Sequence, residues 1–298
     1  MMLRAVTLAV VVTCAALLSG SALAGPQDAV DQFAEGNALL AQADFEAALK
    51  AYTAAAQADP DNSEYRMQAT LVRRVIKIRQ TLDELKDDPK WLTTAKALYT
   101  FYVDNKVHGE ALAIATQINA QEGSPESAAL LARARLAQGM NAAAAEGLRS
   151  VAPDKVNAEL RVLLGLALGR QGQTAAAREL LTKIEEPTPT GCSYLYDLAC
   201  LHALAGDRDQ AVKVLTAYLE NTPPSRLEAA RQRVRKSNDL AALRNHSGFA
   251  TALAVQSKVA ESKCSSGPSC GECPHRAKCG NSGKTGCKGR AKQGQNKP

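Results

Sequence analysis

Small residues recur at a fixed interval along most of this 298-residue chain. Ala111, Ala144, Ala177 and Ala211 stand in similar local contexts at steps of 33, 33 and 34 residues, and Ala48 precedes the first of them by 63. A unit of this length accommodates two antiparallel helices, and such units bury their apolar faces against their neighbours. The spacing therefore predicts a stack of helix pairs.

Other residue classes keep step with these alanines. Gly139, Gly172 and Gly206 occupy the expected turns between paired helices, where positive φ is often needed. The remaining companions are Gly36 with Gly165, Tyr52 with Leu148, Leu181 and Leu215, and Pro60 with Pro189 and Pro223. Several classes in one phase argue against chance, even in an alanine-rich chain.

Composition supports an all-α fold. Aromatic residues make up only 4% of the chain, so helices must pack closely through small side chains. No alternation of apolar and polar residues persists, which argues against strands. Residues 63–90 interrupt the repeat with one long amphipathic stretch, and they form either a degenerate repeat or a single extended helix.

The stretch ADFEAALKAYTAAAQADPDN, residues 43–62, resembles the second half of a tetratricopeptide repeat. The resemblance implies a right-handed superhelical solenoid of helix hairpins, with about five units of which the second is degenerate. In the first unit it implies a close helix approach at Gly36 and small crossing residues at Ala48 and Ala55. Tyr52 would fill the gap between them, and Pro60 would end the unit.

A second resemblance covers roughly Ser193 to Phe249. The segments YLYDLACLHALAGDRDQAV and SNDLAALRNHSGF are similar to the tetratricopeptide end-of-group module of some bacterial repeat proteins. That module implies a cap, placed here at residues 224–261, because the last repeat of a solenoid would otherwise expose an apolar face to water. The repeat domain is therefore expected to span residues 25–261.

A curved stack of this kind presents a concave groove to extended or helical peptides. By resemblance, the groove positions of the first unit are Phe33, Asn37 and Leu40. Asn37 would pair with a backbone amide, and the other two would offer apolar contact. The alternative is that Phe33 and Leu40 only complete the packing at the N-terminal end.

The N-terminus has the three zones of a secretory signal peptide. Arg4 gives a positive start, Ala5 to Leu18 is apolar, and Ala22 to Ala24 matches the A-x-A cleavage pattern. We therefore expect residues 1–24 to be removed and the protein to be exported to a bacterial periplasm or secreted. No later segment is long enough to cross a membrane.

The C-terminal tail, residues 262–298, differs from the rest in composition. It contains eight Lys or Arg residues and one acid, Glu272, which predicts non-specific contact with anionic surfaces. No aromatic residue lies between the cations, so specific nucleic-acid binding is not expected. Cys270, Cys273, Cys279 and Cys287 are candidate ligands of Zn²⁺ or an iron–sulfur cluster. Disulfides, or a disordered thiol-bearing tail, are the alternatives.

No catalytic constellation is evident in the sequence, so we expect a protein that is not an enzyme. The leading hypothesis is an exported scaffold or adaptor that binds a protein or peptide in the solenoid groove. The alternative is a metal-binding or thiol-redox protein that acts through its tail cysteines, with the repeats as a docking platform. The repeat domain itself is expected to need no cofactor.

Overall fold

The computed structural model describes residues 26–86, 88–184 and 194–259. Every regular element in these ranges is helical, which confirms the all-α prediction. The first elements are α1 (Pro26–Ala41), α2 (Phe45–Ala58), α3 (Ser63–Leu82), η1 (Asp83–Leu85), α4 (Lys90–Asp104) and α5 (His108–Glu122). They are followed by α6 (Pro125–Ala137), α7 (Asn141–Arg149), η2 (Pro153–Lys155), α8 (Ala158–Arg170), α9 (Thr174–Leu181), α10 (Leu195–Leu204), α11 (Arg208–Glu220), α12 (Pro224–Lys236), η3 (Ala241–Leu243) and α13 (Ser247–Ala254).

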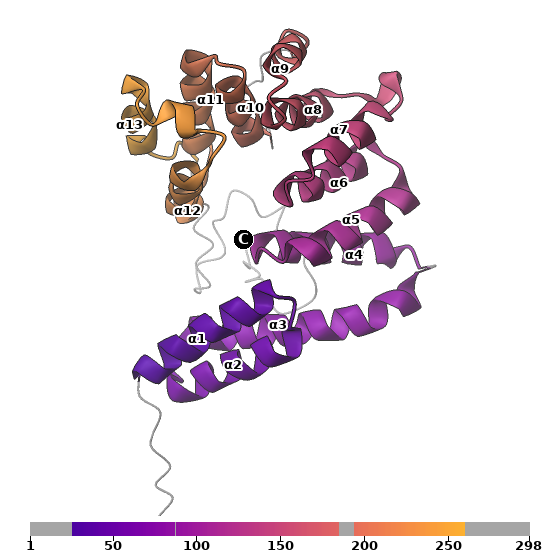
Figure 1. The fold of residues 1–298 in the computed structure, drawn as a ribbon. Helices are drawn as coiled ribbons and strands as arrows, with labels where there is room; N and C mark the ends of the chain where they lie inside the picture. The colour runs from indigo at the N-terminus through magenta and orange to yellow at the C-terminus, as the bar shows by residue number, and fades with distance from the viewer. Residues whose placement is uncertain (1–25, 87, 185–193, 260–298) are drawn as a thin grey trace, which may run out of the picture.

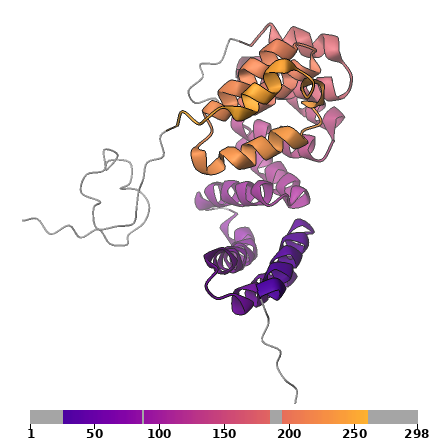
Figure 2. The same cartoon turned by 90° about the vertical axis from the view of Figure 1, so that its left-hand side faces the viewer.

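Ten of these helices form five hairpins in which consecutive helices pack on one another. The pairs are α1/α2, α4/α5, α6/α7, α8/α9 and α10/α11. The first helices of successive hairpins, α6, α8 and α10, also pack side by side. The hairpins follow one another around a curve (Figures 1 and 2). This arrangement confirms the predicted solenoid of helix pairs.

The turn inside every hairpin has the same backbone signature. Gly139, Gly172 and Gly206 have φ of 72°, 76° and 85°, five residues before the next crossing alanine. In the first two hairpins the same position is occupied by Ala43 and Lys106, with φ of 65° and 60°. A residue with a Cβ is strained in this region, so the turn geometry is kept there at a cost in stability.

The recurring alanines lie where the paired helices cross. Ala48, Ala111, Ala144, Ala177 and Ala211 are each at most 1% exposed. Ala55 is likewise buried, while Pro60 lies exposed in the turn after α2. Small side chains at these crossings let the helix axes approach closely, so a larger residue would overpack them.

The two in-phase glycines approach different neighbours. A Cβ at Gly36 would lie 2.7 Å from Cε1 of Tyr52, in the second helix of the same hairpin. A Cβ at Gly165 would lie 2.8 Å from Cδ2 of Leu201, in the first helix of the next hairpin. Gly165 therefore does not simply repeat the role of Gly36, although both permit a close contact.

Residues 63–82 form one continuous helix, α3, which packs on α2 and contacts α4. Of the two alternatives for this stretch, the single extended helix is the one observed. Arg79 joins α3 to the helices around it: the guanidinium lies 4.2 Å from the ring centroid of Phe45, donates to the hydroxyl of Tyr102 at 3.2 Å, and pairs with Glu110 at 3.0 Å.

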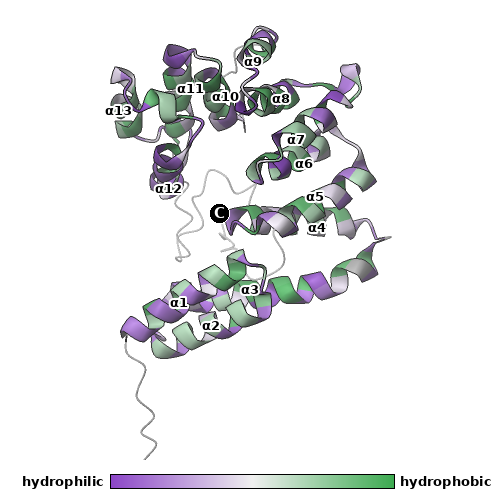
Figure 3. Cartoon of the chain, viewed as in Figure 1, coloured by the Kyte–Doolittle hydropathy of each residue, from purple (hydrophilic) through white to green (hydrophobic). Residues whose placement is uncertain are grey.

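The apolar core runs through the whole stack in two large clusters that meet at α6. Leu131 and Ala134 belong to the cluster built by α1 to α6, and Ala132 and Leu136 to the one that extends to α13. Apolar and polar stretches alternate along most helices (Figure 3), as expected of elements that bury one face. Both halves of the molecule are thus connected through a single helix.

Helices α12, η3 and α13 form a cap at the C-terminal end of the stack. Helix α13 packs on α11, η3 contacts α10 and α11, and α12 contacts α11. Leu227, Val234, Leu240, Leu243 and Phe249 are buried in this region. The cap therefore supplies the last apolar layer of the stack.

Candidate functional site

The predicted groove residues of the first unit are largely engaged in packing. The ring of Phe33 lies 5.4 Å from that of Tyr52 and 4.7 Å from that of Tyr65. Leu40 is only 2% exposed, so the structure places it in the core, where a partner would not reach it. The packing alternative describes these two residues.

Asn37 is exposed, but its side chain already has a partner within the hairpin. Its Oδ1 accepts a hydrogen bond of 2.8 Å from the hydroxyl of Tyr52. Burial raises the pKa of Tyr52 to about 12, so the phenol remains a donor throughout the ordinary pH range. The amide nitrogen of Asn37 makes no hydrogen bond with the described residues, which leaves it free to donate to a partner.

A second set of polar residues lies on the first helices of the later hairpins. We call Arg133, Glu159, Arg170, Tyr196 and Asp197 the C-terminal inner face. Counted back from the crossing alanines, Arg133 has the phase of Asn37, and Tyr196 has the phase of Phe33. These positions were not singled out from the sequence, although the repeat phase identifies two of them.

An ion-pair network crosses this face from one hairpin to the next. Arg133 of α6 pairs with Glu159 of α8 and, at 3.1 Å, with Asp197 of α10. The three side chains are at most 27% exposed. Burial opposes the charge of Arg133, but the two carboxylates outweigh it and raise the pKa of the guanidinium. The network therefore fixes the relative positions of three successive hairpins.

The cap covers the remainder of the C-terminal inner face. Arg170 of α8 forms a bidentate pair with Asp239, which follows α12, with the shortest contact at 2.7 Å, and also donates to the Leu136 carbonyl at 3.0 Å. Arg233 of α12 stacks 3.7 Å from the ring centroid of Tyr196. Figure 1 shows α12 on the inner side of the curve. The chain thus occupies its own groove in this half.

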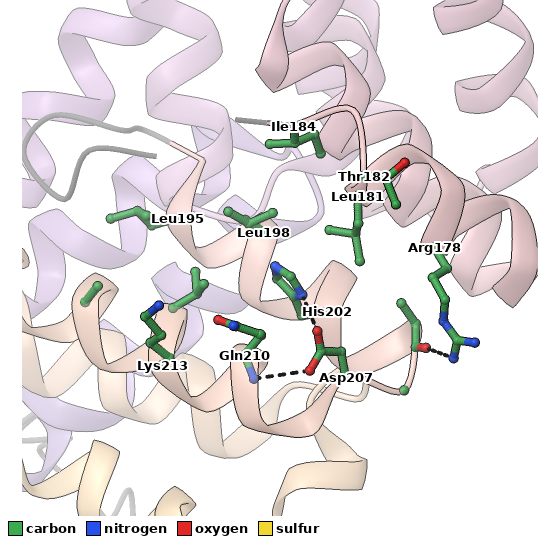
Figure 4. Close-up of a pocket in the computed structure, with 14 residues that line it drawn as sticks. Arg178, Leu181, Thr182, Ile184, Leu195, Leu198, His202, Asp207, Gln210 and Lys213 are labelled. Atoms are coloured by element: carbon green, nitrogen blue, oxygen red, sulfur yellow. Dashed lines mark hydrogen bonds and ion pairs between the residues drawn. The ribbon is translucent and has the colours of Figure 1, made fainter. Parts of the chain in front are cut away.

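A cavity with a volume of about 690 Å³ lies between α9, α10 and α11 (Figure 4). Its apolar wall is formed by Leu181, Ile184, Leu195, Leu198, Val214 and Ala217. Its polar wall includes Arg178, His202, Asp207, Gln210 and Lys213. A cavity of this size suits a small molecule or an inserted side chain.

The polar wall of this cavity contains an imidazole–carboxylate pair. Nδ1 of His202 lies 3.4 Å from the carboxylate of Asp207, and desolvation lowers the pKa of the imidazole more than Asp207 raises it. Among the described residues that line the cavity, Thr182 supplies a hydroxyl, and it donates to the Glu179 carbonyl at 2.7 Å.

The cysteines carry little of the described structure. Cys200 is buried, and desolvation raises the pKa of its thiol to about 12, so it is an inert packing residue. No group of three or more potential metal ligands is found among the described residues. The predicted metal ligands Cys270, Cys273, Cys279 and Cys287 and the predicted signal peptide at residues 1–24 lie outside the described residues. The described helices also include none long and apolar enough to cross a membrane.

Comparison with known proteins assigns no function to the chain. No protein-family profile and no curated protein matches the chain. One similar solved structure is the crystal structure of a tetratricopeptide repeat protein from Parabacteroides merdae ATCC 43184, with a TM-score of 0.39 and 14% identity over 76% of this chain and 98% of that one. The repeat type itself rests on the five hairpins and their 33- to 34-residue interval. By its fold, the chain is a solenoid of helix hairpins, and the interval between its hairpins is that of tetratricopeptide repeats.

Proposed function

We propose that this protein is an exported, non-enzymatic scaffold that binds a protein or peptide partner on the N-terminal part of its solenoid. One observation carries the location. Of the five large apolar side chains exposed in the described chain, four lie on α1, α3 and α4: Val30, Met67, Leu71 and Val103, at 38% to 61% exposure. Met67 and Leu71 lie one turn apart on α3, and neighbouring exposed apolar side chains of this kind mark interaction surfaces.

In the later hairpins the cap already occupies the inner face, which also favours a partner site on the N-terminal part. There the positions that would face a groove are held by Asp239 and Arg233 of the cap. A partner would have to displace these charged contacts and leave Arg170 without its carboxylate. The earlier hairpins present no such obstacle, and the free amide nitrogen of Asn37 adds a polar contact point there.

Affinity capture tests this function. The mature chain, immobilised through its C-terminus, is exposed to envelope extract, and bound proteins are cross-linked and mapped by mass spectrometry. We expect one saturable partner whose cross-links fall on α1 to α5. A partner retained only through residues 262–298, or no saturable partner, would overturn the proposal. A form that ends at residue 261 separates these outcomes.

Export is part of the proposal and has its own measurement. The A-x-A pattern at Ala22 to Ala24 predicts a mature N-terminus near Gly25. N-terminal sequencing of the protein from fractionated cells should find that residue in the periplasm or medium. A chain recovered with Met1 in the cytoplasm would contradict export.

The second candidate function rests on the tail sequence. Four cysteines, with one C-x2-C pair, could bind Zn²⁺ or an iron–sulfur cluster. Elemental analysis of the purified chain decides the matter. One zinc or iron per chain that disappears in Cys273→Ser would support a metal function, and a metal-free tail would remove it.

A further inference from the structure

The stack lacks one helix next to α3. Two repeat intervals would separate Ala48 from Ala111 by 66 to 68 residues and place three helices between the helices that contain them, whereas 63 residues and only α3 and α4 are present. Helix α4 pairs with α5. Helix α3 therefore stands in the place of the first helix of a hairpin whose second helix is absent from the described residues, and none of these residues forms an element that covers the flank left open.

The side chains of α3 show which flank this is. Tyr65, Ala69 and Val72 form the buried face. A second apolar stripe lies on the outward side, where Met67 is 61% and Leu71 38% exposed, and Ile78 on the same stripe is half-buried. Met67 and Leu71 are four residues apart, so they are neighbours one turn apart along the helix.

Positive charge lies on this stripe and beside it, because Arg74 falls between Leu71 and Ile78 at helical spacing. Arg66, Arg73, Arg74 and Lys77 are exposed, and their side chains form no ion pair or hydrogen bond with the described residues. The fifth cation of α3, Arg79, is fully engaged with Glu110 and the neighbouring rings. Glu64 is the only acid in the helix. The uncovered flank thus combines apolar and cationic character within a few turns.

We propose that an amphipathic helix of a partner protein, with acidic residues beside its apolar stripe, packs on Met67, Leu71 and Ile78 of α3 and takes the place of the missing helix. Its carboxylates pair with Arg74 and Lys77. The inference rests on the proposed scaffold function and specifies the partner for it. Helices commonly dock in this way, with the apolar face in a groove and charges that set orientation.

A helix fits this surface better than a membrane does. The stripe runs from Met67 to Ile78, which is about 17 Å along the axis at 1.5 Å per residue. That length matches three turns of a partner helix. Interfacial membrane surfaces use exposed Trp and Phe as anchors, whereas both aromatic residues nearest this stripe, Tyr65 and Trp91, are buried.

The proposal is tested by selecting helical peptides that bind the full mature chain from a displayed library. In this library the apolar residues are fixed along one stripe of the helix, and the residues on both sides of the stripe are randomised. We expect the flanks to become enriched in Glu and Asp. The selected peptides should bind Arg74→Glu/Lys77→Glu about tenfold or more weakly. The matched control Arg149→Glu/Lys155→Glu, which reverses two exposed cations outside α3, should bind normally.

The apolar contact is tested by a second pair of variants, one in the stripe of α3 and one control outside it. Leu71→Asp should abolish binding, while Met140→Asp, at an exposed apolar residue of the α6–α7 turn, should not. Circular dichroism verifies that each variant stays folded. Peptides that bind independently of α3, or that have no acidic flanks, would contradict this inference but would not contradict the scaffold function. The absence of any selected peptide would also overturn it. So would α3-dependent binding to phosphatidylglycerol vesicles but to no peptide.

Discussion

The two halves of this solenoid use the same hairpin in different ways. In the C-terminal half, turn glycines adopt positive φ without strain, an arginine–carboxylate network joins successive hairpins, and the cap fills the inner face. In the N-terminal half, Ala43 and Lys106 occupy the same turn position, and Met67 and Leu71 are open to solvent. The C-terminal half is therefore closed, because its own contacts hold the hairpins together and fill the inner face. The N-terminal half is open, because it retains surface that a partner can cover.

The comparison also locates the boundary between the halves. Helix α6 contributes residues to both large apolar clusters, and Arg133 on the same helix begins the ion-pair network. In a solenoid, each unit is stabilised mainly by its immediate neighbours. A change in one half should therefore weaken the other only through α6.

The largest effect is expected from the cap. Leu243 of η3 is fully buried, and Leu243→Ala should lower the free energy of unfolding of the C-terminal half by about 2–5 kcal/mol. Hydrogen exchange should show lost protection in α10 to α13 and retained protection in α1 to α3. Leu71→Ala, at an exposed site, is the control. An equal loss of protection in α1 would refute the separation of the halves.

The Arg170–Asp239 pair should have the next largest effect. Asp239→Asn keeps the shape of the side chain but removes its charge, and hydrogen bonds to charged groups contribute about 1.5–3 kcal/mol. Urea denaturation should reveal a loss of that order. Glu228→Gln, at an exposed carboxylate that pairs with Arg231 and Arg235, should change little. Equal losses of unfolding free energy in the two variants would show that the Arg170–Asp239 pair contributes no more to stability than an exposed ion pair.

Much of the fold could be predicted from the sequence because its determinants are local. The alanines mark the helix crossings, and the turn glycines at 139, 172 and 206 mark the hairpin turns by their spacing alone. Arg170 and Asp239 are 69 residues apart, so no local pattern shows that the cap would turn back over the inner face. The sequence left open whether Leu40 lines the groove or packs in the core for a similar reason, since its neighbours come from other helices. The missing helix beside α3 was visible as a short interval, but only the structure showed which flank it leaves bare.

Substitutions in the hairpin turns test the difference between the two halves in both directions, with smaller expected changes in stability. Ala43→Gly and Lys106→Gly should each stabilise the N-terminal half by about 0.5–1 kcal/mol, because relief of a left-handed Cβ strain exceeds the added unfolded-state entropy. Gly172→Ala should destabilise the C-terminal half by a similar amount, since its Cβ would meet no atom within 4 Å and only the backbone is strained. Thermal unfolding measures all three. Loss of stability in Ala43→Gly would mean that its Cβ makes a contact that matters.

The smallest effect concerns His202, in the cavity of the closed half. Desolvation lowers the pKa of this imidazole below its ordinary value of 6.5, despite the opposing effect of Asp207. The unfolded chain then binds more protons than the folded one just below pH 6.5, so stability falls as the pH drops through that value and is fully present above it. His202→Gln should remove this part of the pH dependence, as measured by urea midpoints at about pH 5 and 8.

Asp207→Asn sharpens the test, because the amide can still cap α11 while the counteracting charge is gone. An NMR titration should then place the pKa of His202 lower than in the parent chain. A rise instead would mean that hydrogen bonding to the neutral carboxamide, and not the loss of charge, governs the imidazole. The loss of stability at low pH that is linked to His202 would in that case become smaller than in the parent chain.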